Sequence, residues 1–74
     1  MPGVYDEAGA TCRNAAIELE ELAGRVRAKC MPPERDQYDQ VPKLRVELAL
    51  LRIETAAAEL HRAANDFYRE EERP

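Results

Sequence analysis

The feature that most constrains this chain is its second half, which contains neither Gly nor Pro between Pro42 and Pro74. Leu, Arg, Glu and Ala dominate this segment, and all four favour helix formation. Apolar residues recur in it at alternating steps of four and three residues, which is the spacing of one helical face: Val46, Leu50, Ile53, Ala57, Leu60, Ala64 and Phe67. We therefore expect one uninterrupted helix from about residue 42 to residue 72, with Pro42 at its first position.

The beginning of this segment, PKLRVELALLRIE, also has a pattern typical of a β-strand, because Leu44, Val46 and Leu48 alternate with charged residues. A strand here would lack a partner, since no other segment shows comparable alternation or enrichment in β-branched residues. On a helix, the same alternation places a second apolar face opposite the first, formed by Leu44, Leu48 and Leu51. The segment therefore predicts a helix that needs two neighbours.

The first half of the chain predicts another helix, from about residue 6 to residue 30. Asp6 suits its start and Pro32 prevents its continuation, while Thr11 is an alternative, later N-cap. Its main apolar stripe contains Cys12, Ala15, Leu19, Leu22, Val26 and Cys30, and a fainter stripe on the other side contains Ala10, Ile17, Gly24 and Met31. Glycine within a helix costs about 1 kcal/mol relative to alanine. Gly24 therefore indicates either a close approach of another backbone or a tolerated position in solvent.

Residues 31–41 form the linker between the two helices, and Pro32 and Pro33 lie within it. A short linker returns the second helix antiparallel to the first. The sequence thus predicts an all-α fold, a single helical-hairpin domain spanning residues 1–74. A chain of this length buries only about 60% of its unfolded surface, so a second copy or another protein is expected to complete a helical bundle.

The leucine face of the second helix is the expected interaction site, because the first helix can cover only one of its two apolar faces. This face consists of Leu44, Leu48 and Leu51, and Ile17 and Gly24 form a secondary interaction stripe. The alternative is that the linker, through Met31, Tyr38 or Val41, folds back over these leucines within the same chain.

Few residues suggest chemistry. His61 is the only histidine and has no second metal ligand one helical turn away, so it is expected to be a solvated helix residue. Cys12 and Cys30 lie about 27 Å apart along one predicted helix, too far for a disulfide, and are expected to be small apolar core residues. No phosphate-binding loop, Ser/His/Asp set or paired-carboxylate site is apparent. We expect no enzyme activity, cofactor, metal or small-molecule substrate.

The charge balance also limits the partners. The chain has 15 acidic and 11 basic residues and a net charge of -4, which disfavours nucleic acid as a partner. Arg25, Arg27 and Lys29 are explained by the negative end of the first helix dipole. The residues from Leu48 to Leu51 form the longest apolar run, far too short for a membrane span, and the N-terminal residues do not resemble a signal peptide. We expect a cytoplasmic protein that does not bind membranes.

These observations predict a small protein-protein interaction module: an adaptor, co-chaperone or accessory protein, of phage or secretion-system type, that binds through the leucine face. Its expected partner is itself, as a homodimer, or another protein. Two alternatives remain open, a small dimeric helical regulator of nucleic acid and a structural subunit of a larger assembly.

In size and layout the chain resembles the short co-chaperones that guard needle subunits of type III secretion systems. Those proteins are hairpins whose second helix follows a linker containing a Gln-Tyr pair, and Gln37 and Tyr38 occupy that place here. The resemblance covers the linker and the apolar spacing of the second helix. Pro42, four residues after Tyr38, and the charged residues 69–73 depart from the pattern of that family.

Overall fold

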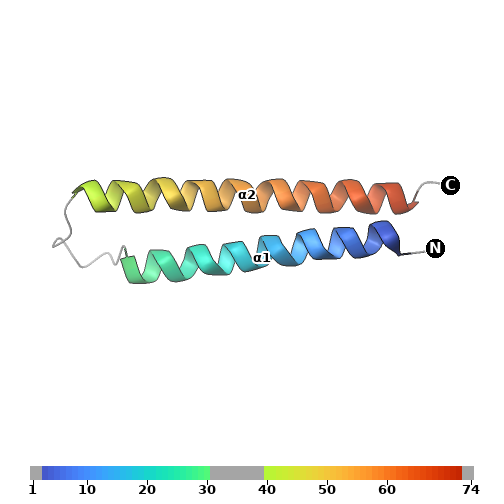
Figure 1. Ribbon diagram of the computed structural model, residues 1–74, viewed down its shortest axis with the longest axis horizontal. Helices are drawn as coiled ribbons and strands as arrows, with labels where there is room; N and C mark the ends of the chain where they lie inside the picture. The colour runs from blue at the N-terminus through green and yellow to red at the C-terminus, as the bar shows by residue number, and fades with distance from the viewer. Residues whose placement is uncertain (1–2, 31–39, 73–74) are drawn as a thin grey trace.

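The computed structural model describes residues 3–30 and 40–72, which form two helices that run antiparallel beside one another (Figure 1). α1 spans Val4–Cys30 and α2 spans Gln40–Glu72, with no strand among the described residues. The predicted all-α hairpin is confirmed. Residues 31–39 lie outside the described residues. The Gln37-Tyr38 pair lies among them, and so does the linker segment that was the alternative cover for the leucine face.

α1 begins at Val4, two residues earlier than predicted and directly after Gly3. Gly3 has a φ of 102°, a value that a residue without a Cβ adopts readily. Its carbonyl accepts the first helical hydrogen bond, from the Glu7 amide at 2.7 Å. Thr11 lies well inside α1, where its hydroxyl donates to the Glu7 carbonyl at 2.9 Å, so the alternative of a later start at Thr11 is wrong.

The start of α2 also precedes the predicted position by two residues, since the helix begins at Gln40 rather than at Pro42. Pro42 therefore lies in the first turn, not at the first position. Backbone N–H groups of a first turn have no acceptor within the helix, so a proline there removes no helical hydrogen bond. The C-terminal ends, Cys30 for α1 and Glu72 for α2, agree with the prediction.

Small residues fill the contact between the helices. The buried residues recur every seven positions on each helix: Gly9, Ala16 and Ala23 on α1, and Leu50, Ala57 and Ala64 on α2. On α2 the buried residues agree with the prediction, since every member of the predicted apolar stripe from Val46 to Phe67 is buried or half-buried. Leu50 is the only large side chain among the buried residues that the structure describes.

On α1 the predicted core stripe is rotated away from the contact. Cys12, Ala15, Leu19 and Val26 are half-buried, but Leu22 is 40% exposed and Cys30 is also exposed. The prediction that Leu22 and Cys30 are core residues is therefore wrong. The physical reason is that small side chains at the centre let the two backbones approach, which moves the larger side chains to the sides of the contact.

The two helices approach each other closely at Gly9. A Cβ on Gly9 would lie 3.0 Å from Cε1 and Cζ of Tyr68 and 3.2 Å from the carbonyl oxygen of Ala64. A Cβ on Gly24 would meet nothing within 4 Å, so within this chain Gly24 faces open space. Because the helices are antiparallel, a step of seven residues forward on α1 corresponds to a step of seven back on α2. Gly9 therefore lies level with Ala64, Ala16 with Ala57, and Ala23 with Leu50, which makes three layers of buried residues.

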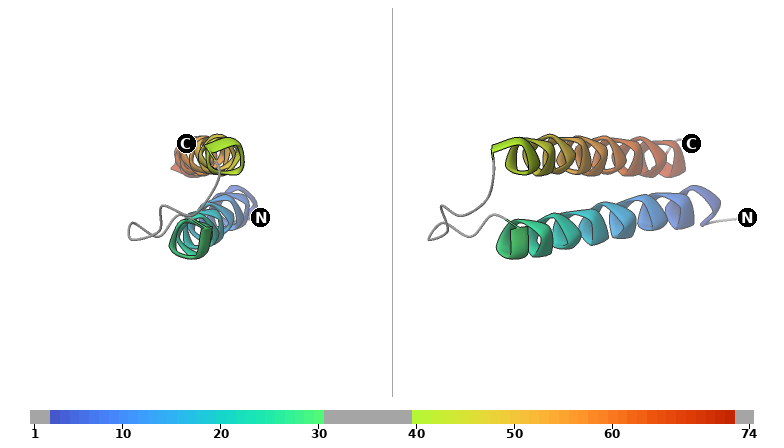
Figure 2. Two further views of the ribbon diagram at one scale, coloured as in Figure 1. Left: turned by 90° about the vertical axis from the view of Figure 1, so that its left-hand side faces the viewer. Right: turned by 60° about the vertical axis from the view of Figure 1, so that its left-hand side comes forward.

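The molecule is a rod rather than a compact globule. Its Cα atoms extend over 58 × 15 × 13 Å, and the radius of gyration is 16.8 Å. A compact domain of this length has a radius of gyration of about 11 Å. Figure 2 shows the pair from the linker end and obliquely, and no other described segment covers the outer side of either helix.

Candidate functional site

The leucine face lies on the first half of α2, turned away from α1. Leu44, Leu48 and Leu51 are 58%, 48% and 61% exposed, whereas Leu50 on the other side of the same helix is 2% exposed. α1 therefore covers one apolar face of α2, and no described residue covers the other. Whether this face binds a partner stays a prediction.

Oppositely charged residues flank the leucine face. Glu47 and Glu54 follow one edge of it and Arg45 and Arg52 follow the other, because these pairs stand seven residues apart on the helix. Beside Leu51 the acidic edge borders a shallow depression lined by Arg27, Glu47, Leu50, Leu51 and Glu54. The face is thus an apolar strip with an acidic and a basic margin.

One side of the hairpin carries a ladder of three polar contacts between the helices. Nη2 of Arg27 lies 3.3 Å from Oε2 of Glu54, and Nε2 of His61 lies 3.4 Å from Oε2 of Glu20. At the third rung the guanidinium carbon of Arg13 lies 5.8 Å from the centre of the Tyr68 ring. The partners advance by seven residues on each helix.

Sequence reasoning missed this ladder, because it treated His61 as a solvated helix residue. His61 is half-buried and contacts α1. The signal that could have revealed the ladder is the equal spacing of Arg13, Glu20 and Arg27 on one helix and of Glu54, His61 and Tyr68 on the other.

The Glu71 carboxylate, near the end of α2, binds the start of α1. The Glu71 side chain accepts hydrogen bonds from the Gly3 amide at 2.8 Å and from the Tyr5 amide at 3.2 Å. The Tyr5 and Phe67 rings stack beside it, with centroids 6.3 Å apart. The first amides of a helix have no partner within the helix and carry partial positive charge, so an anion there stabilises the helix start.

The side of the hairpin opposite the polar ladder carries apolar side chains, most of which are half-buried. We call this surface the apolar seam, and it consists of Cys12, Ala15, Leu19, Leu22 and Val26 from α1 and Ala49, Ile53, Ala56, Leu60, Ala63 and Phe67 from α2. Each of these side chains is half-buried except Leu22 and Ala49, which are exposed. A hollow lined by Tyr5, Ala63, Asp66, Phe67, Arg69 and Glu70 lies at one end of the seam.

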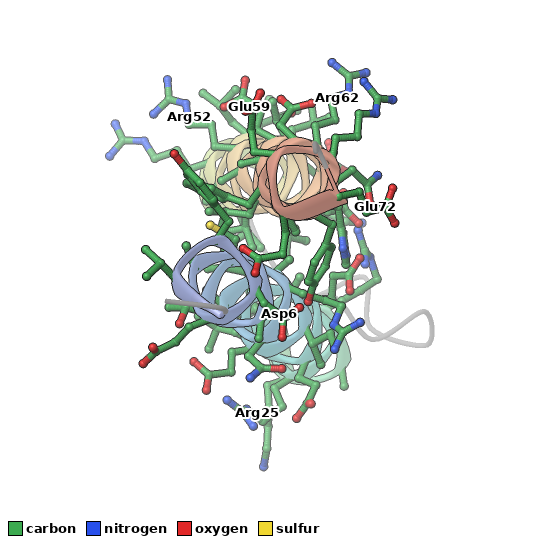
Figure 3. All side chains as sticks on the ribbon, turned by 90° about the vertical axis from the view of Figure 1, so that its right-hand side faces the viewer. Asp6, Arg25, Arg52, Glu59, Arg62 and Glu72 are labelled. Carbon is green, nitrogen blue, oxygen red and sulfur yellow. The ribbon has the colours of Figure 1, made fainter. Side chains whose placement is uncertain are left out.

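The secondary stripe predicted on α1 lies on the surface. Ile17 is 42% exposed and Gly24 is exposed, and the structure brings neither of them to α2. A role of these two residues in binding stays a prediction. Four labelled charged side chains of Figure 3 also point outward: Arg52, Glu59 and Arg62 leave α2 on the side away from α1, and Arg25 leaves the far side of α1.

The described residues contain no group of three or more His, Cys, Asp or Glu side chains that could hold a metal ion, and Cys12 and Cys30 are free thiols. Neither α1 nor the described α2 includes a stretch long and apolar enough to cross a membrane. Comparisons of this chain with protein-family models, with curated proteins and with solved structures find no significant match.

Proposed function

We propose that this protein is a small, non-enzymatic interaction module of the cytoplasm, an adaptor or co-chaperone, that binds an amphipathic helix of another protein through the leucine face. The observation that carries the proposal is the exposure of Leu44, Leu48 and Leu51 at 58%, 48% and 61% on a helix whose other face is packed. Covering the exposed half of each leucine would contribute roughly 1 kcal/mol.

The margins of the leucine face indicate what kind of helix fits. A partner helix with an apolar stripe of three or four residues would lie along the face, as in other helix-in-groove contacts. Its flanks should carry acidic residues next to Arg45 and Arg52 and basic residues next to Glu47 and Glu54. A partner helix with the opposite charge arrangement would have to bind in the reverse direction.

The test is Leu48→Glu, with Asn14→Glu on the exposed outer side of α1 as the matched control. Both changes add one charge to a surface position. The free energy of unfolding of both variants should therefore lie within about 0.5 kcal/mol of that of wild type. Affinity capture from the source cells should recover a partner with wild type and with Asn14→Glu but not with Leu48→Glu. The recovered protein is then purified, and its affinity for wild type, Leu48→Glu and Asn14→Glu is measured by calorimetry.

The expected loss of affinity for Leu48→Glu is several kcal/mol, because a charge would be placed at the centre of a buried contact. Equal binding of Leu48→Glu and wild type would contradict the proposal. If Leu48→Glu instead dissociates a wild-type homodimer, the leucine face pairs two copies of the chain, and the assignment of a different protein to it is wrong.

A further inference from the structure

We propose that two copies of this chain pair through the apolar seam, with their α2 helices side by side and antiparallel, and so close a four-helix bundle. This inference goes beyond the proposed function, because it concerns another surface of the hairpin and another occupant. The apolar residues of the two surfaces do not overlap, since the leucine face lies on the far side of α2 from the seam, with Arg45 and Arg52 between them.

The first support is the state of the larger apolar side chains. The seam carries Leu19, Leu22, Ile53, Leu60 and Phe67, and none of them is fully buried within the single hairpin. The seam contains no charged residue, either from Cys12 to Val26 on α1 or from Ala49 to Phe67 on α2. Packing two such sides together is how two-helix hairpins complete a bundle core.

The second support is the surface area. The chain exposes 6032 Å², about 1,400 Å² more than a compact monomer of its mass is expected to expose. A standard protein interface buries about 800 Å² on each partner. The excess is large enough for one such interface per copy, and a twofold pairing of the seam would use it symmetrically.

The third support is the charge pattern along the edge of the seam on α2. Arg45, Arg52, Glu59 and Asp66 stand seven residues apart, basic in the first half and acidic in the second. This order is complementary to itself only when a second α2 runs antiparallel, so that Arg52 of each copy meets Glu59 of the other and Arg45 meets Asp66. Among the described residues, no ion pair within the chain involves Arg45, Arg52 or Glu59.

The α2 residues of the seam suit the same arrangement. Ala49, Ala56 and Ala63 are centred on Ala56, and the four charged residues are centred between positions 55 and 56. A twofold axis near Ala56 therefore serves both sets at once. The small alanines would let two α2 helices approach closely, while Ile53 and Leu60 would fill the space between the four helices.

The first experiment compares Ala56→Arg in the seam with Ala58→Arg, two residues along the same helix on the leucine side. Sedimentation equilibrium of wild type over a wide concentration range should show a dimer. Ala56→Arg should weaken the dimer by about a hundredfold, and Ala58→Arg should leave it unchanged. A monomeric wild type overturns the proposal, and so does a dimer that Ala58→Arg weakens as much as Ala56→Arg does.

The second experiment tests the pairing of Arg52 with Glu59 and does not depend on a bulky change in the seam. Arg52→Glu chains and Glu59→Arg chains should each dimerise severalfold more weakly than wild type, since like charges meet at both copies of the contact. An equal mixture of the two variants should form heterodimers about as stable as the wild-type dimer, because both contacts then join opposite charges. A mixture that associates no better than either variant alone overturns the antiparallel arrangement.

Discussion

Gly9 and Tyr68 are in contact across the helix pair, so that a Cβ on Gly9 would lie 3.0 Å from two carbons of the Tyr68 ring. The same ring lies under the Arg13 guanidinium at the end of the polar ladder. One glycine thus sets the distance between the helices at the level where the ladder ends. The other glycine in the body of α1, Gly24, has no such neighbour.

Two glycine substitutions on α1 should therefore have opposite effects. Gly24→Ala should raise the free energy of unfolding by up to about 1 kcal/mol, because alanine favours the helix and meets nothing. Gly9→Ala gains the same helix preference but forces the helices apart, which costs about 1 to 3 kcal/mol, so this variant should be less stable than wild type. Thermal melts followed by circular dichroism should show a lower Tm for Gly9→Ala and a higher one for Gly24→Ala. A stabilised Gly9→Ala variant would show that the Tyr68 ring moves aside freely.

The ion pair between Arg27 and Glu54 should contribute modestly to stability, because both side chains are half-exposed. A double-mutant cycle with Arg27→Ala and Glu54→Ala should give a coupling energy of about 0.2 to 1 kcal/mol from urea unfolding at low salt. The coupling should shrink as salt is added. A coupling energy of zero at low salt would mean that the pair has no part in holding the helices together.

Replacement of Glu71 by glutamine should loosen the start of α1. The Glu71 carboxylate accepts hydrogen bonds from two amides, whereas glutamine has one acceptor oxygen and no charge to stabilise the helix start. We expect Glu71→Gln to lose about 1 kcal/mol and to exchange the Tyr5 amide hydrogen faster, as measured by NMR. Glu72→Gln changes the neighbouring exposed residue and is the matched control. Equal amide exchange in both variants would argue against the role of Glu71.

The two cysteines should react at different rates and should not bridge within one chain. Cys12 is half-buried in the apolar seam and Cys30 is exposed at the end of α1. A maleimide reagent should therefore modify Cys30 first, as peptide mapping by mass spectrometry can show. About 27 Å of helix separates the two residues, so the unreduced monomer should keep both thiol hydrogens. An internal disulfide in the folded protein would contradict a continuous α1.

The positions of the helices and the packed face of α2 could be predicted from the sequence because both depend on local chemistry. The absence of Gly and Pro through the second half makes one long helix, and the regular spacing from Val46 to Phe67 fixes the face that α1 covers. The leucine face follows from the same spacing.

The packed face of α1 could not be predicted in the same way, because it depends on the distance between the helices. The sequence pattern gives most weight to large apolar residues and so favours Leu22, while the structure places Ala16 and Ala23 at the contact. The polar ladder could not be predicted either, because it also depends on how the two helices are placed against each other. Glu20 meets His61 only in one alignment of two antiparallel helices, and the spacing within either helix alone leaves that alignment open.

Both described chain ends lie at one tip of the rod, where Glu71 joins the start of α1 to the end of α2 (Figure 1). Leu48 stands near the other tip, about 36 Å along α2 from Glu72. Any polypeptide or surface attached at this tip would therefore be separated from a partner bound at the leucine face by most of the length of α2, which is a rigid spacer.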